Sequence, residues 1–122
     1  MDKGNKMPIA EIKTEADVIH ALSNKTEFER CVLVATYKIP LGKVSTYKRI
    51  AEMINKPHAY RAVANALHKN PLYPVVPCHR VVCSDGKFGG EARQAHSRRQ
   101  LVESEGVPVR NGKVIISDEI LF

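Results

Sequence analysis

Hydrophobic positions repeat with helical spacing between residues 26 and 38. Four apolar residues follow one another at i, i+3, i+4 and i+7: Phe28, Cys31, Val32 and Ala35. This spacing places them on one side of a helix, and we expect that side, Cys31 included, to face the core. Thr26 can cap the helix at its start, and the Ile-Pro-Leu-Gly sequence at 39–42 ends it. A shorter helix is expected before it, at residues 15–22.

Two more short helices follow, separated by a tight turn. The first is capped by Ser45 or Thr46 and runs through Met53, and the second runs from about His58 to Lys69. In both helices apolar and polar residues fall on opposite sides. The inward side is predicted to hold Tyr47, Ile50, Ala51, Val63, Ala66 and Leu67, and the outward side Lys48, Arg49, Arg61, Asn65 and Lys69. This arrangement is typical of a helix-turn-helix.

The last third of the chain combines one helix with a β element. Asn-Pro at 70–71 ends the preceding helix, and three glycines predict a loop at 84–90. A further helix is expected from about Ser97 to Glu105. Residues 107–116 are apolar on both sides of an Asn-Gly pair, which is typical of a β-hairpin with a type I′ turn. The predicted fold class is mainly α with a small β element, a winged-helix-like helix-turn-helix domain.

Size and composition favour one soluble domain. The chain has 122 residues, of which 43% are hydrophobic and 26% are charged. It holds no apolar run long enough to span a bilayer and begins with a polar stretch unlike a signal peptide, so we expect no membrane partner. Three cysteines do not make a disulfide framework, which favours a reducing compartment: the cytoplasm, near the nucleoid, or the nucleus in a eukaryote. Cys78 and Cys83 have only His79 nearby, so no metal site and no cofactor are expected.

Positive charge is concentrated in the middle of the chain. The net charge is +6, but residues 38–99 alone hold twelve Lys or Arg against three acids, so the two ends together carry −3. A segment with this bias attracts phosphates and indicates a nucleic-acid partner. The alternative is a solvated basic face without a partner.

The chemistry is indicated by Pro77-Cys78-His79-Arg80-Val81, where a thiol stands directly beside an imidazole. A cysteine becomes a good nucleophile when a neighbouring base takes its proton, and histidine is the usual base. The alternative is a buried, inert cysteine. Proline, histidine and arginine are poor company for a core residue, which favours the nucleophile.

These motifs resemble a known family. Ile39-Pro40-x-Gly42-x-Val44-Ser45-Thr46-Tyr47, Arg61-Ala62-Val63, Asn70-Pro71, Pro77-Cys78-His79-Arg80-Val81 and Glu105-Gly106 follow one another as in the C-terminal DNA-binding and active-site domain of O6-alkylguanine-DNA alkyltransferases. The resemblance extends from about Phe28 to Gly106. It implies a domain at 25–122 preceded by a short stub at 1–24, in place of the N-terminal domain common in this family.

The resemblance implies a catalytic role for four residues. Cys78 would accept an alkyl group from O6 of guanine as a thioether, once per protein molecule. His79 would remove the thiol proton through a water, and Glu105 would hold the imidazole in its useful tautomer, unless it is only a solvated acid at a helix end. Asn70 would fix the turn before the cysteine segment.

The implied partner is double-stranded DNA containing alkylated bases, bound by a monomer through the minor groove. Arg61 would enter the base stack and replace the flipped nucleotide, since O6 of a paired guanine is closed to in-line attack. Tyr47 would crowd the phosphate of that nucleotide, unless it is a core tyrosine. The small residues Ala62 and Ala64 would let the helix approach the groove. The remaining expected DNA contacts are Ser45, Thr46, Asn65 and Arg80.

The pocket for the base is where the chain departs from the family. The resemblance places Val81, Tyr47 and Arg98 around the base, and the carbonyls of Cys78 and Val81 would accept from its amine. Where the family carries Tyr-Ser-Gly, this chain has Glu91-Ala92-Arg93, and Arg98 stands where the family tends to have Lys. Arg93 could replace the missing tyrosine.

Two other functions fit the same residues. One is a non-catalytic sensor that binds alkylated bases and recruits other repair factors, as alkyltransferase-like proteins of similar length do. The other, which fewer features support, is a transcriptional regulator that reads DNA with residues 47–69. Retention of Cys78 favours alkyl transfer over both.

Overall fold

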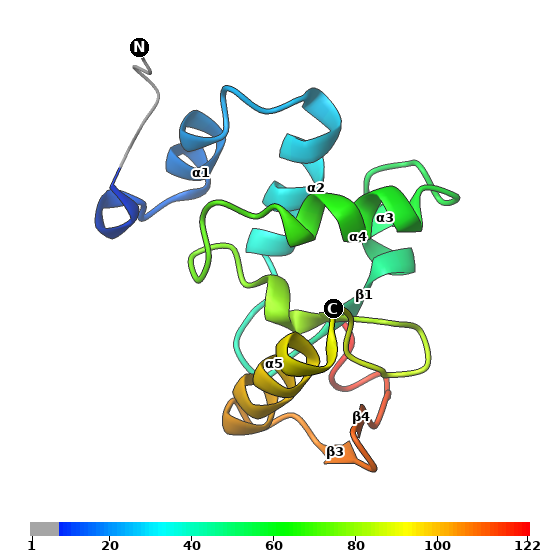
Figure 1. Cartoon of the computed structure of the whole chain (residues 1–122). Coiled ribbons are helices and arrows are strands. Elements are labelled where there is room, and N and C mark those ends of the chain that lie inside the picture. The colour runs from blue at the N-terminus through cyan, green and yellow to red at the C-terminus, as the bar shows by residue number, and fades with distance from the viewer. Residues whose placement is uncertain (1–7) are drawn as a thin grey trace.

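The computed structural model describes residues 8–122 as a mainly helical protein with two small sheets, which confirms the predicted fold class (Figure 1). The elements in order are η1 (Ile9–Glu11), α1 (Glu15–Ala21), α2 (Glu27–Tyr37), β1 (Ser45–Thr46), α3 (Tyr47–Met53), α4 (Tyr60–His68), η2 (Cys78–Arg80), β2 (Val81–Val82), α5 (Ala92–Ser104), β3 (Val109–Arg110) and β4 (Lys113–Val114). Within the described residues no helix is both long and apolar enough to cross a bilayer.

Threonine caps set the first two helices. The Thr14 hydroxyl accepts from the backbone N–H of Asp17 at 3.1 Å, and the Thr26 hydroxyl accepts from that of Glu29 at 3.1 Å. In return each acid accepts from the backbone N–H of its threonine, which completes a capping box. The predicted bounds of α1 and α2 are therefore confirmed to within about a residue, as is the predicted Thr26 cap, whereas the Thr14 cap was not predicted.

The helix-turn-helix is formed by α3 and α4, which pack against each other and against α2. Helix α3 ends in a left-handed Asn55, whose φ is 63°. Its N–H donates to the Glu52 carbonyl at 3.0 Å and that of Lys56 donates to the Ala51 carbonyl at 2.9 Å, a Schellman motif. Helix α4 begins at Tyr60, two residues later than predicted. The inward residues of both helices are buried as expected.

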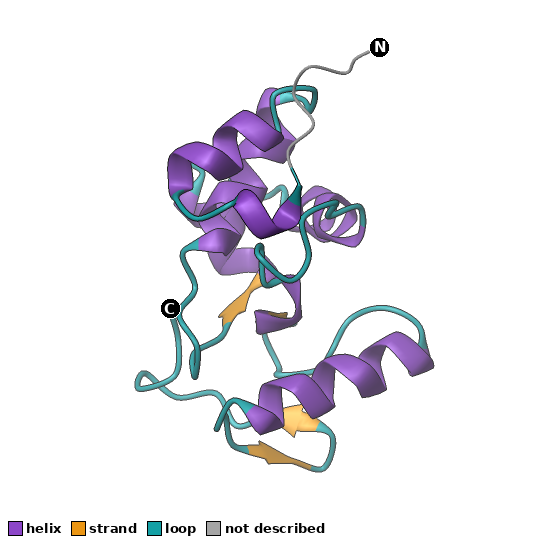
Figure 2. Cartoon of the chain, turned by 90° about the vertical axis from the view of Figure 1, so that its left-hand side faces the viewer, coloured by secondary structure: helices purple, strands orange, loops and turns teal. Residues whose placement is uncertain are grey.

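A short parallel ladder lies between two hydrophobic cores. Strands β1 and β2 pair Ser45 with Val81 and Thr46 with Val82. Because successive strand residues point to opposite faces, Val81 belongs to the core of α1–α4, whereas Val82 belongs to a second core with α5 and the hairpin. Figure 2 shows α5 and the hairpin at one end of the molecule and the other α-helices at the opposite end. The ladder joins the two halves.

The N-terminal segment is part of the first core over its described residues. Ile12, Val18 and Leu22 are buried together with residues of α2–α4. Residues 8–24 are therefore packed on the domain that the sequence places at 25–122. The prediction for Cys31 is wrong: its residue is exposed, and Leu33 and Thr36 are buried on α2 instead. The buried stripe is rotated toward α1 and α4, which cover it.

The second half contains the largest error in predicted bounds. Helix α5 begins at Ala92, five residues before Ser97, and Glu91 is its N-cap. The first turns are polar, so no apolar period marks them, although alanine, arginine and glutamine all favour helix. The hairpin β3–β4 is confirmed, with positive φ at Asn111 and Gly112 as a type I′ turn requires.

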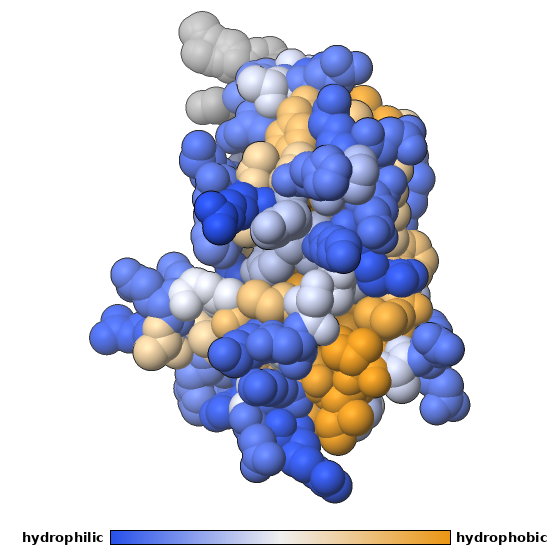
Figure 3. Space-filling view, turned by 90° about the vertical axis from the view of Figure 1, so that its right-hand side faces the viewer, coloured by the Kyte–Doolittle hydropathy of each residue, from blue (hydrophilic) through white to orange (hydrophobic). Residues whose placement is uncertain are grey.

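The C-terminal residues return to β1. The N–H of Val44 donates to the Ile120 carbonyl and the N–H of Phe122 donates to the Val44 carbonyl, both at 2.8 Å. The face in Figure 3 is largely hydrophilic, and its most strongly apolar area lies near the end that carries α5 and the hairpin.

Candidate active site

Cys78 lies at the start of η2, the short 3₁₀-helix that follows the Pro77 bend. Its residue is 9% exposed and touches the first core, yet it also lines a cavity of about 340 Å³. The cavity is bounded by Tyr73, Cys78, His79, Arg93, Gln94, Ser97, Arg98 and Leu101. The sulfur thus belongs to a hollow between η2 and α5 and is not enclosed by apolar side chains alone. This position beside a cavity is the one expected of a nucleophile and differs from that of a cysteine enclosed on all sides.

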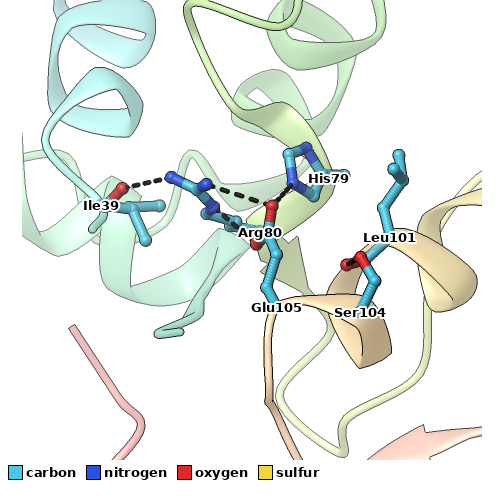
Figure 4. A network of polar contacts seen from close by, with 6 residues as sticks. All are labelled: Ile39, His79, Arg80, Leu101, Ser104 and Glu105. Carbon is cyan, nitrogen blue, oxygen red and sulfur yellow. Dashed lines mark hydrogen bonds and ion pairs between the residues drawn. The ribbon is translucent and has the colours of Figure 1, made fainter. Parts of the chain in front are cut away.

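His79, Arg80 and Glu105 form one connected polar network (Figure 4). Nε2 of His79 lies 2.9 Å from Oε2 of Glu105. Arg80 donates through Nε to Oε1 of Glu105 at 2.8 Å and through a second nitrogen to Oε2 at 3.1 Å. Its remaining guanidinium nitrogen donates to the Ile39 carbonyl at 2.9 Å. All three side chains of the network are largely buried, so their contacts are little weakened by water.

The end of α5 brings Glu105 to this network. Gly106 has a φ of 92° and its N–H donates to the Glu103 carbonyl at 3.0 Å. The N–H of Val107 donates to the Val102 carbonyl at 3.3 Å, and both valines lie in the second core. These are the bonds of a Schellman motif. Glu105 is thereby held at the C-cap of α5, and Gly106 supplies the positive φ that this helix end requires.

A carboxylate at a helix C-terminus is unfavourable, because that end carries partial negative charge. Burial also acts to raise the pKa of Glu105, but the hydrogen bonds from Arg80 and His79 outweigh it and the pKa of Glu105 lies below its ordinary value of 4.5. Glu105 therefore remains an anion at neutral pH. Because a carboxylate only accepts, Nε2 of His79 carries the proton that it receives.

That tautomer leaves Nδ1 of the neutral imidazole as the basic nitrogen. Nδ1 of His79 is buried and has no hydrogen-bond partner among the described residues. The Tyr73 ring meets the His79 ring edge to face, with centroids 5.7 Å apart. Tyr73 and Glu105 thus hold the imidazole from two sides, and Nδ1 is the ring nitrogen left with an unshared lone pair.

Asn70 fixes the segment that precedes Cys78. Its Nδ2 donates to the Val76 carbonyl at 2.8 Å and its Oδ1 accepts from the Leu72 N–H at 2.9 Å. One side chain therefore ties both ends of the connector to the end of α4. The sequence predicted this turn, and the structure has it.

The expected DNA-contact residues divide into exposed and buried ones. Arg61, Ala62 and Asn65 are exposed on one side of α4, and Ala64 is half-buried. Arg61 has no ion-pair partner among the described residues. The α4 residues thus lie on a free surface of the helix-turn-helix.

Three residues expected to contact DNA are used inside the protein. The Ser45 hydroxyl is buried and donates to the Phe122 carbonyl at 3.3 Å. The Thr46 hydroxyl is buried and accepts from the Arg49 N–H at 3.0 Å as the cap of α3. Arg80 is committed to Glu105. The expectation for these three is corrected, because spacing alone does not reveal which polar groups a cap or buried network consumes.

Tyr47 connects the helix-turn-helix with α5. It is 8% exposed and packs in the first core, as the core alternative has it, and burial raises the pKa of its phenol. Its hydroxyl lies 3.5 Å from a guanidinium nitrogen of Arg98. A Cβ at Gly89 would stand 2.4 Å from that hydroxyl, so Gly89 leaves the room that it needs.

The expected base-pocket residues separate in the structure. Arg93 and Arg98 line the cavity with Cys78, whereas Glu91 caps α5, Ala92 faces a different hollow and Val81 is buried in β2. The Cys78 carbonyl already accepts from the Val81 N–H. Within the described residues no group of three or more metal-ligating side chains occurs.

Four lining residues were missed by sequence reasoning: Tyr73, Gln94, Ser97 and Leu101. The last three recur with helical spacing along α5 together with Arg93 and Arg98. If the helix had been predicted to start at Ala92, these residues would have fallen on one face of the predicted helix. Tyr73 carries no comparable indication, because its position depends on how the connector folds.

Comparisons with known proteins agree with this geometry. The family described as "6-O-methylguanine DNA methyltransferase, DNA binding domain" matches residues 27–107. Methylated-DNA–protein-cysteine methyltransferases from Methanosarcina barkeri and Saccharolobus solfataricus are 45% identical over 80 residues and 44% identical over 82 residues. These matches cover 66% and 67% of this chain and 51% and 52% of the relatives. The chain spans about half the length of these relatives.

Solved structures show the same similarity. S. pombe Atl1, in complex with DNA containing O6-carboxymethylguanine, matches with a TM-score of 0.70 at 30% identity, over 79% of this chain and 94% of that one. Mycobacterium tuberculosis OGT in complex with DNA matches with a TM-score of 0.62 at 40% identity, over 66% and 50%. With the family match over residues 27–107 and the Cys78–His79–Glu105 arrangement, these findings show that the chain belongs to the family of the 6-O-methylguanine DNA methyltransferase DNA-binding domain.

Proposed function

We propose that this protein repairs DNA by moving an alkyl group from O6 of a guanine to the sulfur of Cys78, once per molecule. The observation that carries the proposal is the unpaired Nδ1 of His79. It belongs to the residue next to a cysteine in a cavity and is backed by Glu105 on its other side. This is the arrangement that activates a nucleophile through an oriented base.

The reaction is a displacement at the alkyl carbon. His79 accepts the thiol proton through an intervening water, and the sulfur attacks the carbon bound to O6. The new bond joins sulfur and carbon, the bond between carbon and O6 breaks, and its electron pair passes to the guanine. Protonation of the base at N1 restores guanine and balances the proton taken from Cys78. The resulting thioether has no leaving route, so the protein is consumed.

The DNA partner is proposed from the surface of the helix-turn-helix. Arg61, Ala62 and Asn65 lie exposed on α4, in the segment where the positive charge of the chain is concentrated. A monomer would lay this face in the minor groove, and Arg61 would fill the space of the flipped nucleotide. The structure of the Mycobacterium tuberculosis relative in complex with DNA supports a DNA partner.

Mass spectrometry tests the transfer. The protein is incubated with a duplex carrying O6-methylguanine, and peptides are weighed. We expect one methyl group on the Cys78 peptide and none on the peptides of Cys31 or Cys83. A Cys31→Ser variant is the matched control, because that residue is exposed and distant in sequence from the cavity. Intact protein without a methyl group on Cys78 would overturn the proposal.

The second candidate is a sensor that binds alkylated bases without transfer. It is favoured by the similarity to S. pombe Atl1, of which the match covers 94%, and whose structure holds DNA with O6-carboxymethylguanine. The altered Glu91-Ala92-Arg93 sequence points the same way. Lesion-selective binding that survives in Cys78→Ala, together with no transfer by the wild type, would favour the sensor.

A further inference from the structure

We propose that the cavity beside Cys78 selects O6-alkyl groups that carry a negative charge, and that Arg93 and Arg98 bind them. This inference deepens the function proposed above and rests on it, because it concerns the same cavity. It assigns a substrate class: guanines whose O6 substituent ends in a carboxylate, such as carboxymethyl. Neutral alkyl groups are then poorer substrates of the same site.

The side chains around the cavity carry positive charge and no negative charge. Helix α5 contributes five of the lining residues: Arg93, Gln94, Ser97, Arg98 and Leu101. Their spacing of i, i+1, i+4, i+5 and i+8 is that of one helix face. Tyr73, Cys78 and His79 complete the lining, so two guanidinium groups and no carboxylate surround the hollow. An anion placed there meets two guanidinium groups and no carboxylate.

Neither guanidinium is already neutralised. Among the described residues, Arg93 and Arg98 have no carboxylate partner, and the contact of Arg98 is the uncharged Tyr47 hydroxyl at 3.5 Å. The two nearby acidic residues, Glu91 and Glu105, have other structural roles. Glu91 caps α5 two residues before Arg93, a spacing at which helix side chains do not meet, and Glu105 is held by Arg80 and His79.

Arg99, the next arginine of α5, differs from these two because it does have polar partners. Arg99 contacts Nδ1 of His96 at 2.8 Å and lies 3.9 Å from Oε1 of Glu103, and it lines a different hollow. Arg93 and Arg98, on the cavity side of α5, thus have no carboxylate partner among the described residues, whereas Arg99 on the neighbouring side has one. Arg93 also lies in the first turn of α5, where the helix dipole adds to the attraction for an anion.

A carboxylate on the adduct would lie in the cavity beside these arginines when the reaction occurs. The alkyl carbon must reach the sulfur of Cys78, so the rest of the substituent lies in the cavity that Arg93 and Arg98 line. A DNA phosphate offers the same anionic chemistry to a guanidinium. A phosphate, however, accompanies every lesion and would not distinguish one O6 group from another.

The step itself balances as for other alkyl groups. The sulfur of Cys78 attacks the methylene carbon, the bond from that carbon to O6 breaks, and its electron pair goes to the guanine. The thiol proton is matched by the proton that guanine gains at N1. The product is S-carboxymethylcysteine, whose carboxylate stays beside the two arginines.

The experiment compares two duplexes that differ only in one charge. One carries O6-carboxymethylguanine, and the other carries the neutral carbamoylmethyl analogue of nearly equal size. Single-turnover transfer to Cys78 is followed by mass for the wild type, Arg93→Gln, Arg98→Gln and the control Arg99→Gln. Because the two adducts differ in intrinsic reactivity, the measured quantity is the ratio of their rates, compared between proteins.

We expect Arg93→Gln and Arg98→Gln each to lower the ratio of carboxymethyl to carbamoylmethyl transfer, by roughly tenfold where a charge-assisted hydrogen bond is lost. Arg99→Gln should leave the ratio as in the wild type. Equal loss on both duplexes would assign the arginines to phosphate and overturn the inference. So would an unchanged ratio in both cavity variants.

Failure of the proposed function gives a different result. If no alkyl group of any kind is transferred, the same ratio is measured as lesion affinity, with Cys78→Ala as the parent protein for the arginine variants. A preference for the carboxymethyl duplex that is lost with Arg93 or Arg98 still supports the inference. Equal affinities for the two duplexes overturn it.

Discussion

Arg80 stabilises the carboxylate of Glu105 at the C-terminal end of α5. The carboxylate is opposed by the helix dipole and by burial, and two hydrogen bonds from one guanidinium compensate for both. Among residues 8–122 Arg80 reaches no acid other than Glu105, and it also donates to the Ile39 carbonyl. It is therefore a positioning residue for the His79–Glu105 pair, and not the DNA contact that sequence reasoning expected.

Arg80→Gln should destabilise the protein by about 3 kcal/mol, because it leaves a largely buried carboxylate without its guanidinium. Urea unfolding measures this loss. Arg99→Gln is the control, since its ion pair with Glu103 is partly exposed and should contribute less than about 1 kcal/mol. Equal effects of the two substitutions would contradict the role given to Arg80.

The acid sensitivity of folding should depend on Glu105. Its pKa is lower in the folded protein than its ordinary value of 4.5, so its contribution is present above pH 4.5 and is lost as pH falls through the folded value. Glu105→Gln should be less stable than the wild type at pH 7, and the difference should shrink below pH 4.5. Asp17 and Glu29 also have lowered pKa values, but both proteins retain them. A difference that does not change with pH would contradict this assignment.

At the scale of elements, local chemistry made the early helices predictable. Thr26 marks the start of α2, and the Asn111-Gly112 pair marks the hairpin, because each acts on backbone groups within a few residues. Helix α5 was predicted too short because its cavity face and its outer face are both polar. The prediction that Cys31 is buried was wrong for a related reason. Periodicity shows which residues share one side of a helix, but the neighbouring elements decide which of those residues are covered.

Gly106 is the residue that makes α5 end where Glu105 is needed. Its φ of 92° is strained for any residue with a Cβ, although a Cβ there would meet no atom within 4 Å. Gly106→Ala should therefore cost about 1 kcal/mol of stability through conformation alone, and should slow alkyl transfer by displacing Glu105. Ser104→Ala, in the last turn of the same helix, is the control. A variant with normal transfer would show that the C-cap geometry is not needed.

At the scale of the whole molecule, the cavity exists only because two cores are joined. Cys78 is part of the first core, Val102 of α5 is part of the second core, and the cavity is lined by residues of both η2 and α5. The motif around Cys78, with His79 and Glu105, was identified from the sequence because its members lie in recognisable motifs. The contribution of Tyr73 was not, since its position depends on how the connector between α4 and η2 folds.

The two halves of the proposed reaction can be separated in the same way. Arg61 lies on α4, outside the cavity, so it should serve extraction of the nucleotide and not attack by sulfur. Arg61→Ala should lower the transfer rate from a duplex lesion by roughly tenfold or more, because nothing then offsets the cost of unstacking. Transfer from free O6-benzylguanine, which needs no flipping, should remain close to that of the wild type.

The comparison needs a basic residue removed elsewhere, because loss of one charge weakens DNA binding in general. Lys113→Ala in the hairpin serves this purpose, since Lys113 is exposed and lies in β4, away in sequence from the helix-turn-helix. Rates measured at saturating protein exclude the effect of affinity. If Arg61→Ala lowers transfer from the duplex and from the free base equally, then α4 acts on the chemistry at Cys78, and the division between flipping and transfer is wrong.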